Sequence, residues 1–203
     1  MKEYVIKTLE KMPTDFSGIE KAEISNYRWG KDYTPRATAQ LAMVKDFGFI
    51  LRMVCEESSP LSRFKNYYDP VYKDSCLEFF ARYDDLSPDY VNIEMNANGA
   101  LLSAKGDGRH GRIPTRDICG EIFEVCTQKR DNEWEAIAKI PFSMLKKLYG
   151  MDIQKFKSGY VFSGNFYKCG DETAIVHYGA WSEVETETPD FHRPEFFGKL
   201  IIE

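Results

Sequence analysis

Short runs of alternating apolar and polar residues, each closed by turn-forming residues, recur along most of this chain of 203 residues. RATAQLAMV and FILRMVCEE are separated by the turn KDFG, and DYVNIEMN ends at the turn ANG before ALLSAK. Strands at this spacing are typical of antiparallel sandwiches and barrels. We therefore predict an all-β fold, an antiparallel, jelly-roll-like β-sandwich, formed by one domain over residues 1–203.

One segment follows a helical pattern instead. PFSMLKKLYG begins at Pro141, places Leu145 and Leu148 on one face and ends at Gly150. Proline at the first helical position and glycine just past the end are common helix boundaries. We predict one short helix here, and about ten strands elsewhere in the chain.

Alternation within the strands sorts their two faces. In DYVNIEMN, the apolar Val91, Ile93 and Met95 share one face, and Asn92 and Glu94 share the other. A polar face of this kind is a solvated sheet surface in many proteins, but Asn, Tyr and Arg together are more common where a ligand docks. In other strands the same alternation places these polar side chains opposite apolar ones: Arg52, Glu78, Asn165 and Tyr167.

Charge and cysteine content exclude some classes of partner. The net charge is -5 and the basic residues form no stripe, which argues against nucleic acid as the main partner. The N-terminus MKEYVIKTLEKMPTDF has Lys or Glu every few residues, so it predicts neither a signal peptide nor a membrane span. The five scattered cysteines form no CxxC pair and predict reduced thiols and a cytoplasmic location.

Catalytic motifs are absent from the sequence, which contains no GxSxG, HExxH, P-loop or GxGxxG pattern. GDGRHGR (residues 106–112) is predicted to be a surface hairpin loop. Glycoside hydrolysis needs two carboxyl groups roughly 5 to 9.5 Å apart. Asp74 and Glu78 lie four residues apart in one strand, which separates them by about 13 Å. Only a cross-strand pair such as Glu78 and Glu94 could serve, and the sequence does not determine whether those strands are neighbours.

Metal sites are predicted only weakly by the residue spacing. The three histidines show no metal-binding pattern, so a zinc site would need the fold to unite His177 and His192 with a carboxylate such as Asp190. Buried or stacked histidines are the alternative interpretation. The loop YYDPVYKDS carries Asp69 and Asp74, whose carboxylates could furnish a calcium site.

Five longer stretches follow one another in an order that matches a known family. They are YDPVYKDSCLEFF, YVNIEMNANGALL, WEAIAKIPFSML, GNFYKCGD and HYGAWSEVETETPDFHRPEFFGKLII. Together, from about Ala22 to the C-terminus, they resemble family 9 carbohydrate-binding modules, in particular the family-9-like branch of DOMON-like sandwiches. The resemblance implies a jelly-roll-like sandwich that binds sugars without catalysis, often holds structural calcium and takes part in carbohydrate catabolism.

The resemblance also carries some roles over to particular residues. The acidic residue of the DS-x-x-E strand is Glu78 in this sequence, and the asparagine of the GNFY strand is Asn165. The family's arginine before the Asn-x-x-Gly turn falls at Glu94, so an acid stands in place of a base.

Both tryptophans that clamp a sugar in the best-known members of the family are missing here. Their positions fall at Val71, beside Tyr72, and at His192, beside Phe191. The glucan-end specificity of those members is therefore not expected to carry over. Tyr72, His192, Phe191 or Trp29 could rebuild a stacking wall, because aromatic faces pack on the C–H face of a pyranose.

The terminal segment TPDFHRPEFFG (residues 188–198) is stiffened by two prolines. It either presents His192 and Arg193 to a ligand or plugs the open end of the sandwich, with Arg193 paired to a nearby carboxylate. Trp134 and Trp181 are predicted to be core residues.

These observations lead to a hypothesis of non-catalytic binding of a mono- or oligosaccharide. The alternatives are a glycoside-active enzyme that uses Glu78 and Glu94, and a sandwich that binds a partner protein or a cofactor such as haem. In the leading hypothesis Tyr72 and His192 stack on the sugar and the other side chains form hydrogen bonds with its hydroxyls. The candidate ligand contacts are Arg52, Tyr72, Glu78, Asn92, Glu94, Asn165, Tyr167 and His192.

Overall fold

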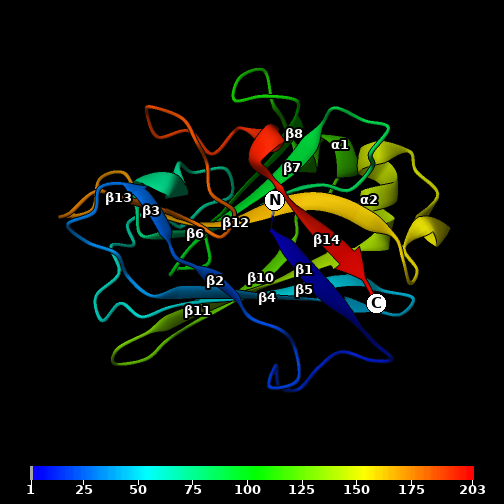
Figure 1. Ribbon diagram of the computed structural model, residues 1–203, viewed down its shortest axis with the longest axis horizontal. Coiled ribbons are helices and arrows are strands. Elements are labelled where there is room, and N and C mark those ends of the chain that lie inside the picture. Colours follow the sequence, from blue (N-terminus) through cyan, green and yellow to red (C-terminus); the bar gives the residue numbers. More distant parts are fainter. Residues whose placement is uncertain (1) are drawn as a thin grey trace.

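The computed structural model describes residues 2–203 as two β-sheets packed face to face (Figure 1). This arrangement confirms the predicted β-sandwich. Sheet A contains β3 (Asn26–Trp29), β6 (Cys76–Arg82), β7 (Tyr90–Asn96), β8 (Leu101–Gly106), β9 (Ile113–Pro114), β12 (Val161–Gly170), β13 (His177–Ala180) and β14 (Gly198–Ile202). Sheet B contains β2 (Ala22–Ile24), β4 (Ala37–Val44), β5 (Gly48–Cys55), β10 (Glu124–Lys129) and β11 (Trp134–Pro141).

Strand β1 (Glu3–Leu9) joins the two sheets, and the sequence analysis did not predict it. Its first half pairs with β14 and its second half with β4, both in parallel. The sandwich is therefore mixed, not purely antiparallel as predicted. Charged residues interrupt the apolar run of β1, but Tyr4 and Ile6 alternate with them and are buried in the core.

The main hydrophobic core lies between the two sheets. Val91, Ile93 and Met95 of β7 all belong to it, as their alternation predicts. Trp134 and Trp181 are buried there too, with 0% and 4% of their surfaces exposed, which confirms both predictions.

A second apolar cluster covers part of the outer face of sheet A. Phe80 and Tyr167 contribute to it from the strands, and Phe191 and Phe197 from the terminal segment. The ring of Phe191 stacks on that of Tyr167 with 4.0 Å between centroids. The terminal segment, with the short 3₁₀ helix η3 (Pro194–Phe196), therefore packs as a cover on this face. The segment thus covers a sheet face, not the open end of the sandwich that the structural alternative predicted, while Arg193 pairs with Glu195 as that alternative expected.

Two α-helices and two further 3₁₀ helices complete the fold. The predicted helix is confirmed as α2 (Phe142–Tyr149), which buries Leu145 and Leu148. Helix α1 (Thr115–Cys119) was not predicted; Gly120, at a φ of 76°, ends it. No helix within residues 2–203 combines the length and apolar character needed to cross a membrane. The remaining 3₁₀ helices are η1 (Val71–Lys73) and η2 (Ile153–Lys155).

Candidate functional site

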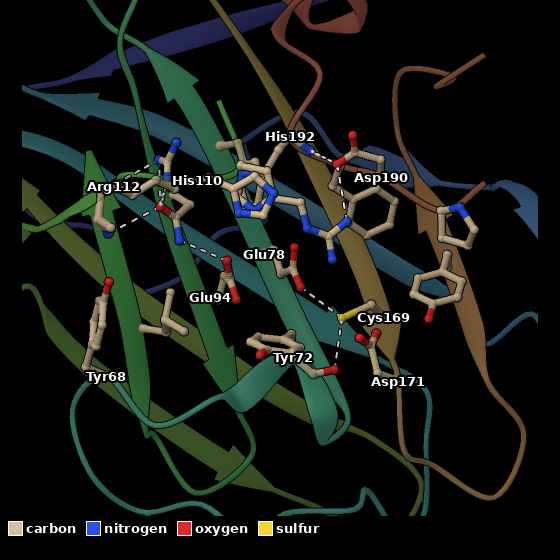
Figure 2. A pocket seen from close by; sticks show the side chains of 18 of the residues that line it. Tyr68, Tyr72, Glu78, Glu94, His110, Arg112, Cys169, Asp171, Asp190 and His192 are labelled. Atoms are coloured by element: carbon tan, nitrogen blue, oxygen red, sulfur yellow. Dashed lines mark hydrogen bonds and ion pairs between the residues drawn. The ribbon is translucent and has the colours of Figure 1, made fainter. Parts of the chain in front are cut away.

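A cavity of about 460 Å³ lies against the outer face of sheet A (Figure 2). Strands β6, β7, β8 and β12 provide its floor, and the segment after β8 and the terminal segment provide its upper wall. A volume of this size is typical of a small-molecule site. Five of the residues predicted to contact a ligand line it: Tyr72, Glu78, Asn92, Glu94 and His192.

Glu78 and Glu94 stand side by side on the floor of the cavity. They are direct partners in the antiparallel register of β6 and β7, which places their Cβ atoms about 5 Å apart. Only 2% of Glu78 and 4% of Glu94 is exposed. The structure thus provides the strand adjacency that the sequence could not establish.

The two carboxyl groups have few hydrogen-bond partners. The Cys169 thiol donates to Glu78 Oε1 over 2.8 Å, and Asn92 Nδ2 donates to Glu94 Oε1 over 2.8 Å. Glu94 Oε2 is buried and has no partner among residues 2–203. Burial raises the pKa of Glu78 to about 7, and burial with the neighbouring Glu78 carboxyl raises the pKa of Glu94 well above its usual range.

Arg112 fastens the segment after β8 to the cavity wall. Its Nη2 donates to Asn92 Oδ1 over 2.7 Å and to Tyr90 O over 3.0 Å, and its Nε donates to Asn92 Oδ1 over 3.1 Å. Its Nη1 donates to the carbonyls of Gly106 and Gly108. The guanidinium also lies over the Tyr90 ring, 4.2 Å from the centroid. Burial lowers the pKa of Arg112. Every guanidinium nitrogen is therefore engaged within the protein.

His192 lines the cavity from the terminal segment but is held by neighbouring rings. Its Nδ1 and the Tyr90 hydroxyl lie 2.7 Å apart, and its ring is 4.9 Å from the Phe80 centroid. Burial, followed by the nearby arginines, lowers the pKa of His192 to about 3. The imidazole is therefore neutral at physiological pH.

Two partly exposed tyrosines stand at the opposite wall. Tyr72 on η1 is 36% exposed and Tyr68 is 42% exposed. Tyr68 has a φ of 69°, which is rare for an aromatic residue, and its amide donates to Leu101 O over 2.7 Å. Strained backbone of this kind is concentrated at binding sites. The sequence analysis proposed Tyr72 for stacking and missed Tyr68.

The structure places Arg52 away from the cavity. Arg52 lies on β5 of sheet B, and its Nη2 is 2.6 Å from Glu135 Oε2 while its Nη1 donates to Gln40. Alternation identified the polar face of β5 correctly, but that face belongs to the other sheet. The prediction that Arg52 shares a site with Glu78 and Glu94 is therefore corrected.

Asn165 and Tyr167 lie on the face of sheet A that bears the cavity, yet neither lines it. The Asn165 side chain bonds both backbone groups of Ser182 over 2.8 Å. The Tyr167 hydroxyl donates to Phe191 O over 3.3 Å under the terminal segment. Both side chains are buried, so the prediction that they contact a ligand is corrected. Instead, each side chain holds the chain segment that packs above it.

Asn165→Ala is expected to lower the free energy of unfolding by about 1 to 2 kcal/mol, because the Ser182 backbone groups lose their partner. Sugar affinity should change by less than about 2-fold, because the amide does not face the cavity. Urea denaturation and calorimetric titration measure the two effects. A large loss of affinity in a folded variant would show that Asn165 takes part in sugar binding after all.

Further lining residues come from loops whose role the sequence analysis missed. Arg109, His110 and Arg112, predicted to lie in a surface hairpin loop, reach over the cavity (Figure 2). Asp171, which directly follows β12, and Tyr178 on β13 also line the cavity. In the sequence, two arginines and a histidine between glycines were the only indication of a ligand contact in this loop. Whether these side chains point toward the cavity depends on how the loop folds back, which the sequence does not show.

Hydrogen-bond donors already engage the carboxylates proposed for calcium, and a calcium site stays a prediction. Asp74 accepts from the amides of Arg63 and Phe64, from Arg63 Nε over 2.9 Å and from Asn96 Nδ2 over 3.0 Å. Asp69 accepts from the amides at positions 65 and 66. Donors thus engage both oxygens of Asp74 and Oδ2 of Asp69, which are oxygens that calcium would need.

Other metal donors are occupied as well. His177 Nε2 is 2.6 Å from Lys168 Nζ and His177 does not line the cavity, so it does not join His192 in a zinc site. Cys76, Glu78 and Cys169 are the one group of three donors found in residues 2–203, within 4.8 Å of one another. Burial raises the pKa of both thiols, and the Cys169 thiol already donates to Glu78, so a metal ion would have to displace these protons.

Comparisons with known proteins agree with this architecture. No curated protein matches the sequence. A candidate carbohydrate-binding protein from Bacteroides uniformis ATCC 8492 is 24% identical, with a TM-score of 0.82 over 100% of this chain and 99% of that one. A family 9 carbohydrate-binding module from Caldicellulosiruptor kristjanssonii, in complex with glucose, is 13% identical with a TM-score of 0.70, over 100% and 96% of the two chains. Its complex with cellotriose has a TM-score of 0.67 at 12% identity, over 100% and 94%. The model of carbohydrate-binding family 9 matches residues 9–202. The chain belongs to carbohydrate-binding family 9.

Proposed function

We propose that this protein binds a mono- or oligosaccharide in the cavity on sheet A and does not transform it. The observation that carries the proposal is the pairing of an open tyrosine wall with a buried polar floor. Tyr72 offers an exposed ring face, while Glu78 and Glu94 offer carboxyl oxygens. A pyranose needs both, because its C–H face packs on aromatic rings and its hydroxyls need hydrogen bonds.

Two complexes in the same family support a sugar as the ligand. The Caldicellulosiruptor kristjanssonii module was solved with glucose and with cellotriose. The two positions at which the resemblance places clamp tryptophans do not offer a free ring in this protein. Val71 is buried, and His192 packs on Phe80 and Tyr90. We therefore assign the stacking surface to Tyr72, assisted by Tyr68, in place of the pair of Tyr72 and His192.

The carboxyl pair favours binding over hydrolysis. Glycosidases hold an acid and a base or nucleophile on two sides of the scissile bond. Glu78 and Glu94 instead rise from neighbouring strands of a single sheet and share the floor of the cavity. Both pKa values are raised, so neither group is the fully ionised nucleophile that a retaining mechanism needs at neutral pH. A part in carbohydrate catabolism and a cytoplasmic location stay predictions from the sequence.

Tyr72→Ala is expected to weaken binding about 3- to 10-fold, because the variant loses one aromatic stacking partner. Isothermal titration of wild type and variant against glucose, cellobiose, and acidic and amine-bearing monosaccharides measures the change. Recovery of the sugar unchanged after prolonged incubation tests the absence of catalysis.

Leu86→Ala is the matched control, because Leu86 is 84% exposed and does not line the cavity. Its affinities should equal those of the wild type. A folded protein that binds no sugar in the panel, or that releases product from one, would contradict the proposal.

A further inference from the structure

The floor of the cavity is rich in hydrogen-bond acceptors. Glu78 and Glu94 face one another across β6 and β7, and both line the cavity (Figure 2). Asp171, just after β12, adds a third carboxyl group to the lining. A ligand that reaches the floor therefore meets carboxyl oxygens.

One of these oxygens lacks a partner within the protein. Glu94 Oε2 accepts no hydrogen bond from residues 2–203, although the residue is only 4% exposed. Leaving a buried polar atom unpaired destabilises a protein, and more so when the group is charged. Once the carboxyl group is ionised, such an atom in a side chain that lines a cavity calls for a donor from the ligand.

The basic side chains of the cavity do not neutralise the pair. Among the described residues, no Lys, Arg or His nitrogen lies within the 4.0 Å ion-pair distance of either carboxyl group. Arg112 directs its donors to Asn92 and to backbone carbonyls, and Arg109 is 3.7 Å from Asp190 at the upper wall. Among the described residues the two carboxyl groups therefore have no cation as a direct partner, and their donors are the Cys169 thiol and the Asn92 amide.

We propose that the cavity selects a sugar that carries a protonated amine, whose ammonium group lies between the carboxyl groups of Glu78 and Glu94. An ammonium supplies several N–H donors and a positive charge, whereas a sugar hydroxyl supplies one donor and no charge. This inference rests on the proposed function, since the same cavity must hold the sugar.

Ammonium binding is coupled to proton release. Burial and the Glu78 carboxyl raise the pKa of Glu94, Asn92 and Arg112 act in the opposite direction, and Asp171 raises it slightly. A cation beside Glu94 favours the ionised form and displaces a proton. Affinity for an amino sugar therefore increases from about pH 5.5 to about pH 7 and decreases again as the amine loses its proton.

The test compares glucosamine with glucose and N-acetylglucosamine by isothermal titration of the wild-type protein. We expect glucosamine to bind at least about 10-fold more tightly than either neutral sugar at pH 6.5, where its amine is protonated, since charged hydrogen bonds are the stronger ones. Titration in buffers of different ionisation enthalpy should show release of up to about one proton for glucosamine only. This comparison needs no variant and so does not depend on a substitution folding correctly.

Glu94→Gln provides the second measurement, with circular dichroism to verify the fold. The ratio of glucosamine to glucose affinity should fall at least about 10-fold, because the amide carries no negative charge. Glu187→Gln, an exposed carboxyl in the terminal region, should leave that ratio unchanged.

Each outcome has a distinct meaning. Binding of glucose with equal or weaker binding of glucosamine would overturn the inference and leave the proposed function standing. Absence of binding to both neutral and amine-bearing sugars would overturn the inference and the proposed function. Preference for glucosamine without any effect of Glu94→Gln would show that the ammonium lies elsewhere and would also reject the proposed site.

Discussion

Glu78→Gln is expected to raise the free energy of unfolding by roughly 2 to 3 kcal/mol at pH 8 and to leave it almost unchanged at pH 4. The physical reason is burial, which raises the pKa of Glu78 to about 7. An uncharged amide of the same shape avoids the cost of a buried negative charge. It also offers an N–H donor toward Glu94, whose Oε2 lacks one.

The pH window follows from the direction of the shift. Below the ordinary carboxyl pKa of 4.5, Glu78 is protonated in both the folded and the unfolded chain, so it contributes no pH-dependent difference. As the pH rises from there toward about 7, the unfolded chain ionises first and the folded chain binds more protons. Wild-type stability therefore falls across this window and levels off above it.

Urea denaturation of both proteins between pH 4 and pH 8 measures the difference. Glu23→Gln, an exposed carboxyl on β2, is the control and should change stability by less than about 0.5 kcal/mol at any pH. Equal effects of Glu78→Gln at pH 4 and pH 8 would show that shape, not charge, decides the stability at this position.

If the cavity floor is a binding site, we expect that a substitution there can stabilise the protein. Two carboxyl groups side by side in a buried position destabilise the fold above neutral pH, and a fold under selection for stability alone would use neutral residues there. A ligand that binds the ionised pair would offset this cost by binding only the folded state.

The sequence predicts which face each strand turns to the core, because a period of two depends only on local geometry. Glu78 and Glu94 were assigned to the right faces in this way. Their adjacency was out of reach, because it depends on the pairing of β6 with β7 in register. Arg52 illustrates the same limit. Alternation identifies the polar face of its strand, but it does not show to which sheet that strand belongs.

Loops carry most of what the sequence could not predict. Tyr167 and Asn165 point to the side of the sheet that bears the cavity, but the terminal segment and the chain near Ser182 cover them. Conversely, Arg112 belongs to a glycine-rich loop that folds back on β7 and β8. Such folding depends on long-range hydrogen bonds, which leave no periodic pattern in the sequence.

Arg112→Ala is expected to lower the free energy of unfolding by roughly 3 to 4 kcal/mol and to weaken sugar binding at least about 10-fold. The substitution removes bonds to Asn92 Oδ1 and to the carbonyls of Tyr90, Ala104 and Gly108, and leaves the Ala104 amide as the remaining donor to Asn92 Oδ1. The loop that forms the upper wall of the cavity is then no longer fastened to sheet A. Asn92 in turn holds Glu94, so the floor is disturbed as well.

Arg112→Lys should rescue little of either loss, because one ammonium cannot reproduce the planar fork of donors or its stacking on Tyr90. Arg109→Ala is the matched control: Arg109 lies in the same loop, is exposed and is 3.7 Å from Asp190, so stability should change by less than about 1 kcal/mol. Thermal and urea unfolding, with sugar titration at a temperature where each variant is folded, separate the two effects. If Arg112→Ala unfolds like the wild type, the loop is held by other contacts. If it loses stability but keeps full sugar affinity, the upper wall takes no part in binding and the ligand rests on the floor and on Tyr72 alone.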